Sequence, residues 1–164
     1  MSTNGTVFAR LRRSFVGTDD AVIGRLATEH LIEQGCTRIA YLRGPETATG
    51  AGRLKGFRDA LAANGLSASE SSIIDPVAAG ALKAILEAGL RIPQDVAVIG
   101  AGNVHYSDLL RVSLTTIDQD SAGMAEHAAK LLLRHITSKA PAPPEAILLN
   151  PRILVRDSTI RRQT

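Results

Sequence analysis

The sequence is poor in several kinds of residue, and each shortage excludes a class of protein. Cys36 is the only cysteine among 164 residues, so no disulfide can form within the chain, and four histidines do not suffice for a Cys/His metal cluster. Aromatic residues make up only 3% and tryptophan is absent. No run of about 18 apolar residues is present to span a membrane, and the first fifteen residues lack the apolar stretch of a secretory signal. We therefore expect a cytoplasmic protein with an aliphatic core, no metal and no other cofactor.

The positive charge of the chain is concentrated at its two ends. The net charge is +3, but residues 1–13 and 152–164 together carry +6, which leaves −3 for the residues between them. A mildly acidic centre is a poor surface for a polyanion, and arginine-rich ends are usually solvated. The basic isoelectric point of about 9.4 is thus weak evidence for nucleic-acid binding.

Apolar spacing and capping signals predict four helices. The first follows the caps at Thr18 to Asp20 and stops at Gly35, and the second covers 52–64. Asp75 followed by Pro76 predicts the start of a third, which Gly89 ends. The fourth, over 121–136, is expected to pack through Met124, Ala128, Leu131 and Leu132.

Short apolar runs between these helices predict strands. The runs are RIAYLRG (38–44), SSIID (71–75), VAVIG (96–100), LTTI (114–117), AILLN (146–150) and RILVRDS (152–158), with LTTI expected to be the more exposed. Alternating helices and apolar strands indicate an α/β protein whose parallel sheets are flanked by helices. The order helix, glycine stop, turn and strand occurs twice, which suggests two lobes with a cleft between them.

Four segments carry a resemblance to a known family. VGTDDAVIGRLATEHLIEQGCTRIAYLRGP, RLKGFRDALAANGL, DPVAAGALKAILEAGLRIPQDVAVIG and LTTIDQD occur in that order. Together they resemble the effector-binding core of the LacI family of bacterial transcription regulators, which is related to periplasmic sugar-binding proteins. The resemblance implies an incomplete two-lobed fold, divided into a tail or remnant strand (1–14), a first-lobe segment (15–74), a second-lobe segment (75–118) and a last part with a lobe-crossing strand, a helix and final strands (119–164).

The resemblance also implies a function and a set of binding residues. Such a chain is not an enzyme: it binds a sugar or related polyol, forms a homodimer, and contacts DNA only through a helix-turn-helix headpiece that is absent here. By position, Asp19 and Arg53 would hydrogen-bond to hydroxyl groups, Gln119 would lie on the crossing strand, and Asn103 and Asp75 would stand near polar positions of the family. From its place after a glycine-rich loop, Tyr106 is a further candidate, able to stack on a sugar face.

Ordinary structural roles compete with these assignments. Asp19 can act as a helix cap, which is worth about 1 kcal/mol. Arg53 opens an amphipathic helix, where arginine is ordinarily a solvated charge. Asn103 after glycine is common turn chemistry, and Asp75 before proline is common capping.

Two departures from the family leave other functions open. Ala101, Gly102 and Asn103 stand where the family carries an aromatic residue and two acidic ones, and a helix and a strand are missing between SSIID and the PVAAGAL helix. The chain could therefore be a dimerisation remnant that no longer binds ligand. A small Rossmann-like nucleotide-binding enzyme is the other alternative, although no P-loop or G-x-S-x-G nucleophile elbow is present.

Overall fold

The computed structural model describes residues 14–42, 47–69, 73–74, 79–105, 107–138 and 143–160. The chain divides into two compact units. Unit 1 comprises Met1–Asp19 and Gln119–Pro151, and unit 2 comprises Asp20–Asp118 and Arg152–Thr164. Among the described residues, none of the helices is both long and apolar enough to cross a membrane.

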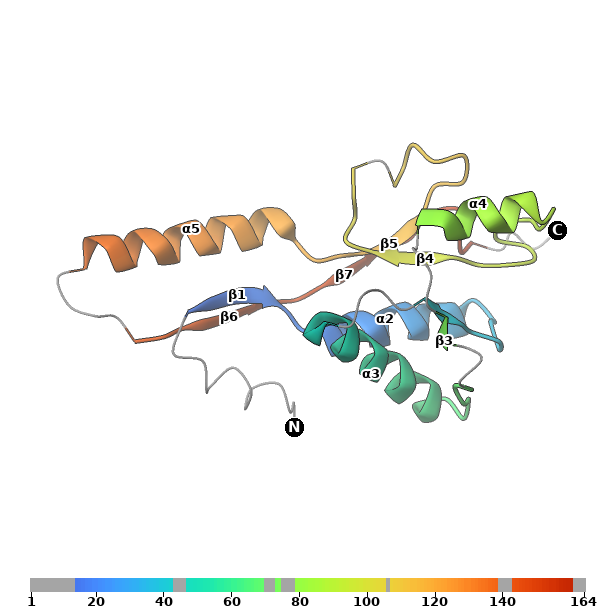
Figure 1. Cartoon of the computed structure of the whole chain (residues 1–164), viewed down its shortest axis with the longest axis horizontal. Helices are drawn as coiled ribbons and strands as arrows, with labels where there is room; N and C mark the ends of the chain where they lie inside the picture. The colour runs from blue at the N-terminus through green and yellow to red at the C-terminus, as the bar shows by residue number, and fades with distance from the viewer. Residues whose placement is uncertain are drawn as a thin grey trace. The chain divides into compact units, whose positions relative to one another are not determined.

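Unit 1 consists of a parallel strand pair and one helix (Figure 1). Strand β1, Phe15–Thr18, pairs with β6, Ala146–Leu149, in a register that sets Phe15 opposite Ala146. Helix α5, Ser121–Thr137, contacts both strands and buries Leu131. The backbone N–H of Gly123 donates to the side chain of Asp120, which caps the first turn.

The predicted packing of α5 is only partly correct. Its bounds agree with the expected 121–136, and Leu131 is buried as expected. Leu132, however, is 59% exposed, and Ala128 is exposed as well. The reason is geometric: residue 132 lies about 100° around the helix from residue 131, so a two-stranded sheet that covers one does not cover the other.

The described part of unit 2 contains three helices. They are α2, Asp20–Glu33; α3, Ala48–Ala63; and α4, Ala79–Glu87. Helix α3 begins four residues before the predicted start because the Thr47 hydroxyl accepts from the Gly50 N–H and caps it there. The predicted start of α4 at Asp75 and Pro76 lies outside the described residues. Gly35 and Gly89 have positive φ values of 79° and 73°, as the predicted glycine stops require.

The described strands of unit 2 form two separate sheets. Strand β2, Tyr41–Leu42, pairs in parallel with β3, Ile73–Ile74. Strand β4, Ile99–Ala101, pairs in parallel with β5, Thr115–Asp118, and β5 pairs antiparallel with β7, Arg152–Leu154. The α/β class with parallel sheets is therefore confirmed, with one antiparallel strand added at an edge. The core side chains of this unit include Ile23, Leu31, Phe57, Ala60, Leu61, Ile92 and Ile117.

A buried network of hydroxyl groups joins β5 to the C-terminal segment, so the prediction of an exposed LTTI strand is wrong. Thr115 shares a hydrogen bond of 2.8 Å with Thr159, and its backbone N–H donates to the Ser158 hydroxyl. Thr159 in turn contacts Nε2 of the buried His30 at 2.8 Å. Because each hydroxyl has a partner, threonine and serine side chains can be fully buried here without an unsatisfied group.

The two units do not follow the expected lobe boundaries at residues 15–74 and 75–118. Helix α2 packs against α3 and also against β4, β5 and β7, and the bond from His30 to Thr159 fixes it there. The expected first-lobe segment therefore shares a unit with the expected second-lobe segment. The chain instead changes units three times, after Asp19, after Asp118 and after Pro151.

Candidate functional site

The candidate residues of unit 1 lie at the end of β1 and just after β5. Thr18 ends β1, and its hydroxyl donates to Oε1 of Gln119 at 3.3 Å. Asp19 follows Thr18 directly and is half-buried. The structure thus brings two predicted binding residues, Asp19 and Gln119, to the same part of unit 1. Their oxygen and amide atoms can accept from and donate to hydroxyl groups.

Arg53 of unit 2 is held by Asp20, a residue that the sequence did not identify as a partner. Arg53 Nε donates to Asp20 Oδ1 at 3.0 Å, and both side chains are about a quarter exposed. This contact joins α3 to the first turn of α2. The guanidinium is therefore oriented by a carboxylate, as is common where arginine presents its donors to a polar ligand.

Two glycines explain how Arg53 comes so close to α2. A Cβ atom on Gly24 would lie 2.0 Å from the carbonyl oxygen of Arg53, and one on Gly56 would lie 2.0 Å from that of Ala21. Only glycine permits such an approach of the two backbones. The spacing G-x-x-x-G at 52 and 56, on the helix opposite Gly24, is the sequence signal that could have indicated the contact.

The pKa of Tyr41 is also affected by its surroundings near Arg53 and Asp20. Burial raises the pKa of the Tyr41 phenol, while the positive charge of Arg53 opposes the shift and the negative charge of Asp20 adds to it. The Tyr41 ring lies 5.4 Å, centre to centre, from the ring of Phe57. The charged groups of Arg53 and Asp20 thus lie close enough to Tyr41 to affect its pKa, and the raised pKa keeps the phenol neutral.

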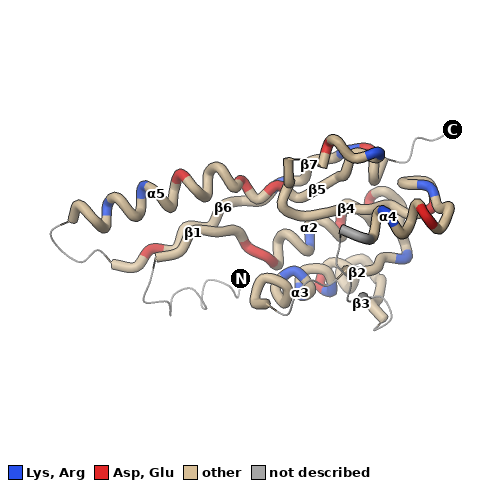
Figure 2. The backbone as a smooth tube through the Cα atoms, turned by 45° about the horizontal axis from the view of Figure 1, so that its top comes forward, with Lys and Arg blue, Asp and Glu red and all other residues tan. Residues whose placement is uncertain are grey.

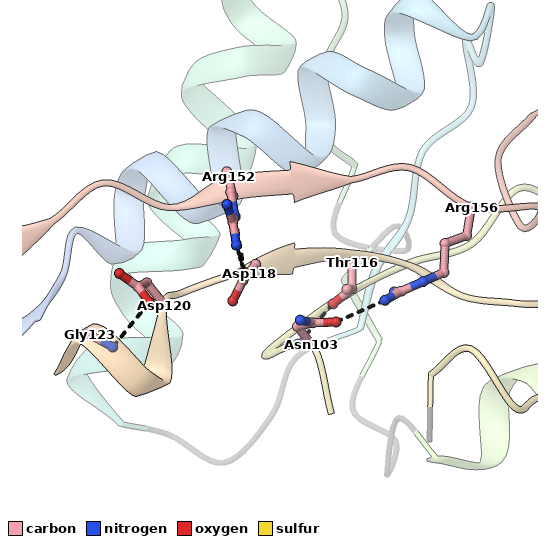
Figure 3. Close-up of polar contacts among 7 residues, drawn as sticks. All are labelled: Asn103, Thr116, Asp118, Asp120, Gly123, Arg152 and Arg156. Atoms are coloured by element: carbon pink, nitrogen blue, oxygen red, sulfur yellow. Dashed lines mark hydrogen bonds and ion pairs between the residues drawn. The ribbon is translucent and has the colours of Figure 1, made fainter. Parts of the chain in front are cut away.

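Asn103 is fixed by Arg156 and Thr116 (Figure 3). Its Oδ1 accepts from Arg156 Nη2 at 3.0 Å, and its backbone N–H donates to the Thr116 hydroxyl at 3.2 Å. Its φ of 44° is left-handed, which asparagine tolerates better than most residues. Asn103 therefore has the turn conformation that the sequence suggested. Among the described residues, its side-chain NH₂ group has no hydrogen-bond acceptor.

A second ion pair, which the sequence did not indicate, lies on neighbouring strands. Arg152 of β7 donates from Nε and Nη2 to Oδ2 of Asp118 on β5, at 3.1 and 3.0 Å (Figure 3). The two residues are register partners in the antiparallel pair. Each is the residue of unit 2 nearest to a change of unit along the chain. Asp118 is therefore engaged by a protein partner.

Two predicted binding residues and the possible metal ligands remain to be considered. Asp75 and Tyr106 lie outside the described residues. Among the residues that are described, no group of three His, Cys, Asp or Glu side chains is placed to hold a metal ion. The donors and acceptors described above suit reversible hydrogen bonding to a polar solute.

Two known family profiles match the sequence of this chain. Residues 73–159 match the profile of the periplasmic binding protein-like domain, and residues 14–75 match that of the periplasmic binding proteins and sugar binding domain of the LacI family. The chain is 35% identical over 176 residues to the HTH-type transcriptional repressor PurR of Escherichia coli, across 85% of this chain and 51% of PurR. It therefore spans about half the length of this relative.

Solved structures show the same fold. The transcriptional regulator CelR in complex with cellobiose is 28% identical, with a TM-score of 0.83 over 90% of this chain and 54% of CelR. A LacI family regulator from Enterococcus faecium with bound ribose is 27% identical, with a TM-score of 0.78 over 92% of this chain and 66% of that one. Both of these structural relatives are named as transcriptional regulators.

The internal gap that the sequence suggested has support in the same comparisons. One family profile ends at residue 75 and the other begins at residue 73. The alignment to PurR runs over 176 positions, more than the 164 residues of this chain, so PurR carries residues inside the matched region that this chain lacks. Together with the shared fold, the two profile matches assign this chain to the periplasmic binding protein-like family, as an incomplete core of the LacI type.

Proposed function

We propose that this chain binds a sugar or related polyol as the effector core of a LacI-type bacterial transcription regulator. In this proposal Asp19 and Gln119 accept and donate hydrogen bonds to ligand hydroxyls, Arg53 contributes a fork of donors, and Asn103 contributes its amide. The complete regulator acts in the cytoplasm as a homodimer and reads DNA through a separate headpiece.

The observation that carries the proposal is the orientation of Arg53. Its Nε bond to Asp20 and the close approach of α2 and α3 at Gly24 and Gly56 hold the arginine in one place. Such preorganisation lowers the entropy lost when a ligand binds. The bound cellobiose and ribose of two structural relatives make sugars the first ligands to test.

Glycine at position 102, where the family carries an acidic residue, affects the ligand affinity that we expect. Gly102 has a φ of 111° and its N–H donates to the Ile117 carbonyl, so its backbone is shaped by glycine and not by an acidic residue. One carboxylate expected from the family is missing. We therefore expect ligands to bind more weakly than in a relative that retains it.

Thermal unfolding in the presence of sugars tests the proposal. A ligand that binds only the folded state at 100 times its Kd stabilises it by about 2.7 kcal/mol. Cellobiose, ribose, further sugars and nucleosides would be screened for a rise in melting temperature. The rise should disappear in Arg53→Gln and Asp19→Asn and persist in Lys55→Gln, which alters an exposed cation two residues away on α3. No rise with any compound would favour a dimerisation remnant instead.

A further inference from the structure

Asn103 stands just past the carboxyl end of a strand in a parallel pair. It follows β4, and its backbone N–H donates to the Thr116 hydroxyl of β5 at 3.2 Å. The preceding N–H, of Gly102, donates to the Ile117 carbonyl at 2.9 Å. The carboxyl ends of parallel strands are where open α/β sheets bind their ligands. Two bonds to β5 therefore fix the backbone that carries the Asn103 amide at such a place.

Arg156 holds the Asn103 amide in one orientation. Arg156 Nη2 donates to Asn103 Oδ1 at 3.0 Å, and its Nη1 donates to the Leu114 carbonyl at 2.7 Å. The backbone of Arg156 is fixed as well, because its N–H donates to the Thr115 hydroxyl and its carbonyl accepts from the same group. A guanidinium carries donors only, so it faces the amide oxygen and not the amide NH₂ group. The NH₂ group lies on the side of Asn103 away from Arg156 (Figure 3).

The group that Asn103 leaves for a ligand is therefore a hydrogen-bond donor. Arg53, the other candidate binding residue among the described part of unit 2, likewise presents donors only. A sugar hydroxyl can accept from such a donor, but its own hydrogen then needs an acceptor, whereas a carboxylate or phosphate oxygen only accepts. A hydrogen bond to an ionised acceptor is also roughly twice as strong as one between neutral groups. The donors of this unit thus suit an anionic oxygen better than a hydroxyl group.

The charge beside Asn103 favours an anion as well. Both side-chain bonds of Arg156 go to neutral oxygens, and no carboxylate of the described residues forms an ion pair with it. Residues 96–104, which include Asn103, contain no acidic residue and are tan in Figure 2. Arg156 is half-buried, where a charge is screened less by salt than on the open surface. Its positive charge is therefore available to an anionic ligand.

We propose that the ligand of this chain presents an anionic oxygen, from a carboxylate or a phosphate, to the Asn103 NH₂ group, and that Arg156 sets this preference. Sugar acids or sugar phosphates are then favoured over neutral sugars with the same skeleton. Arg156 is a positioning residue, because it acts through the orientation of Asn103 and through its charge. The inference rests on the proposed function, since it names the class of sugar that the same site takes.

Calorimetric titration with matched pairs of compounds tests the preference. Glucuronate is compared with glucose, and ribose 5-phosphate with ribose, at neutral pH and equal ionic strength. The anion of a pair should bind about tenfold more tightly than its neutral counterpart, the ratio that about 1.4 kcal/mol gives. The pair with the larger ratio distinguishes a carboxylate from a phosphate. Neutral sugars that bind as tightly as their anions would overturn this inference and leave the proposed function standing. No binding by these four compounds or by any compound of the thermal screen would overturn both.

Two substitutions test the roles of Asn103 and Arg156. Asn103→Asp keeps the size of the side chain but replaces its NH₂ donor by an acceptor and pairs with Arg156, so the neutral sugar should become the tighter ligand. Arg156→Gln removes the charge and frees the amide to turn, so the two affinities should become nearly equal. Lys83→Gln, at an exposed cation of α4, is the charge-matched control and should retain the parent's ratio. Because the ratio compares two ligands on one variant, a general loss of stability does not change it. A parent-like ratio in Asn103→Asp or Arg156→Gln would refute the assignment.

Discussion

Gly56 on α3 lies so close to Ala21 on α2 that a Cβ atom would come within 2.0 Å of the Ala21 carbonyl oxygen. Gly24 meets the Arg53 carbonyl in the same way from the other helix. The two helices therefore pack backbone to backbone where Arg53 projects. The helix crossing that requires glycine at positions 24 and 56 is therefore also the place of the candidate binding residue Arg53.

Gly56→Ala tests the crossing. The added methyl group must push α2 and α3 apart, and overpacking of this kind costs about 1–3 kcal/mol. We expect a lower denaturant midpoint with an unchanged slope, measured by urea unfolding. Ala62→Ser on the exposed side of the same helix is the control and should leave the midpoint in place. A Gly56→Ala chain as stable as the parent would mean that the helices lie farther apart than described.

Thr115→Val tests the buried hydroxyl network. Valine has nearly the shape of threonine, but it removes a group that bonds both Thr159 and the Arg156 backbone. Leaving these buried groups without a partner costs about 1–3 kcal/mol. Chemical denaturation should show that loss, whereas Thr37→Val at an exposed position should show almost none. Equal stability of the two variants would contradict the network.

The stability of the chain should fall in mild acid because of His30. Burial lowers the pKa of His30 below its ordinary value of 6.5, and the nearby Glu33 carboxylate partly opposes this shift. The unfolded chain therefore takes up a proton more readily than the folded chain. Stability contributed by neutral His30 is present above pH 6.5 and is lost as the pH falls below it.

The test compares how the melting temperatures of the parent and of His30→Gln change with pH. The melting temperature of the parent should drop more between about pH 7.5 and 5.5 than that of His30→Gln, because the latter lacks the buried imidazole whose pKa is lowered by folding. His105→Gln, at an exposed site, should retain the parent's pH dependence. Parallel curves for parent and His30→Gln would rule out this role for His30.

Asp20 is expected to act on ligand binding through Arg53. Asp20→Asn keeps the side-chain shape but weakens the charge-assisted bond to Arg53 Nε. Affinity for a sugar that passes the thermal screen should fall about tenfold, or about 1.4 kcal/mol, as measured by calorimetric titration. Asp59→Asn, which disturbs only the exposed pair with Lys55, should leave affinity unchanged. If both variants bind like the parent, Asp20 does not position Arg53 for a ligand.

Helices were easier to predict from the sequence than strands. The caps and apolar stripes of α2 and α5 are local signals, and both helices appear within about a residue of their expected ends. Strand LTTI was misjudged because its threonines look polar in isolation. Their burial depends on hydroxyl and carbonyl partners more than 40 residues away, at Arg156 and Thr159. No local pattern reveals such partners.

The residues of the candidate site were predictable from the sequence, but their hydrogen-bond partners were not. Resemblance suggested Asp19, Arg53 and Gln119, and the structure places Asp19 and Gln119 in one unit. The partners that hold these residues, Asp20 for Arg53 and Arg156 for Asn103, were missed. The contacts of α2 with β4, β5 and β7, all distant along the chain, could not be predicted from local sequence either.

The pairing of Phe15 with Ala146 has a consequence for biosynthesis. A ribosome releases β1 well before β6, the strand's only hydrogen-bonded neighbour among the described strands, because 131 positions separate Phe15 from Ala146. Until then its edges are exposed to other nascent chains. Contacts so distant along the chain also slow folding. Newly made β1 is therefore a natural segment for chaperones to shield until β6 has been synthesised.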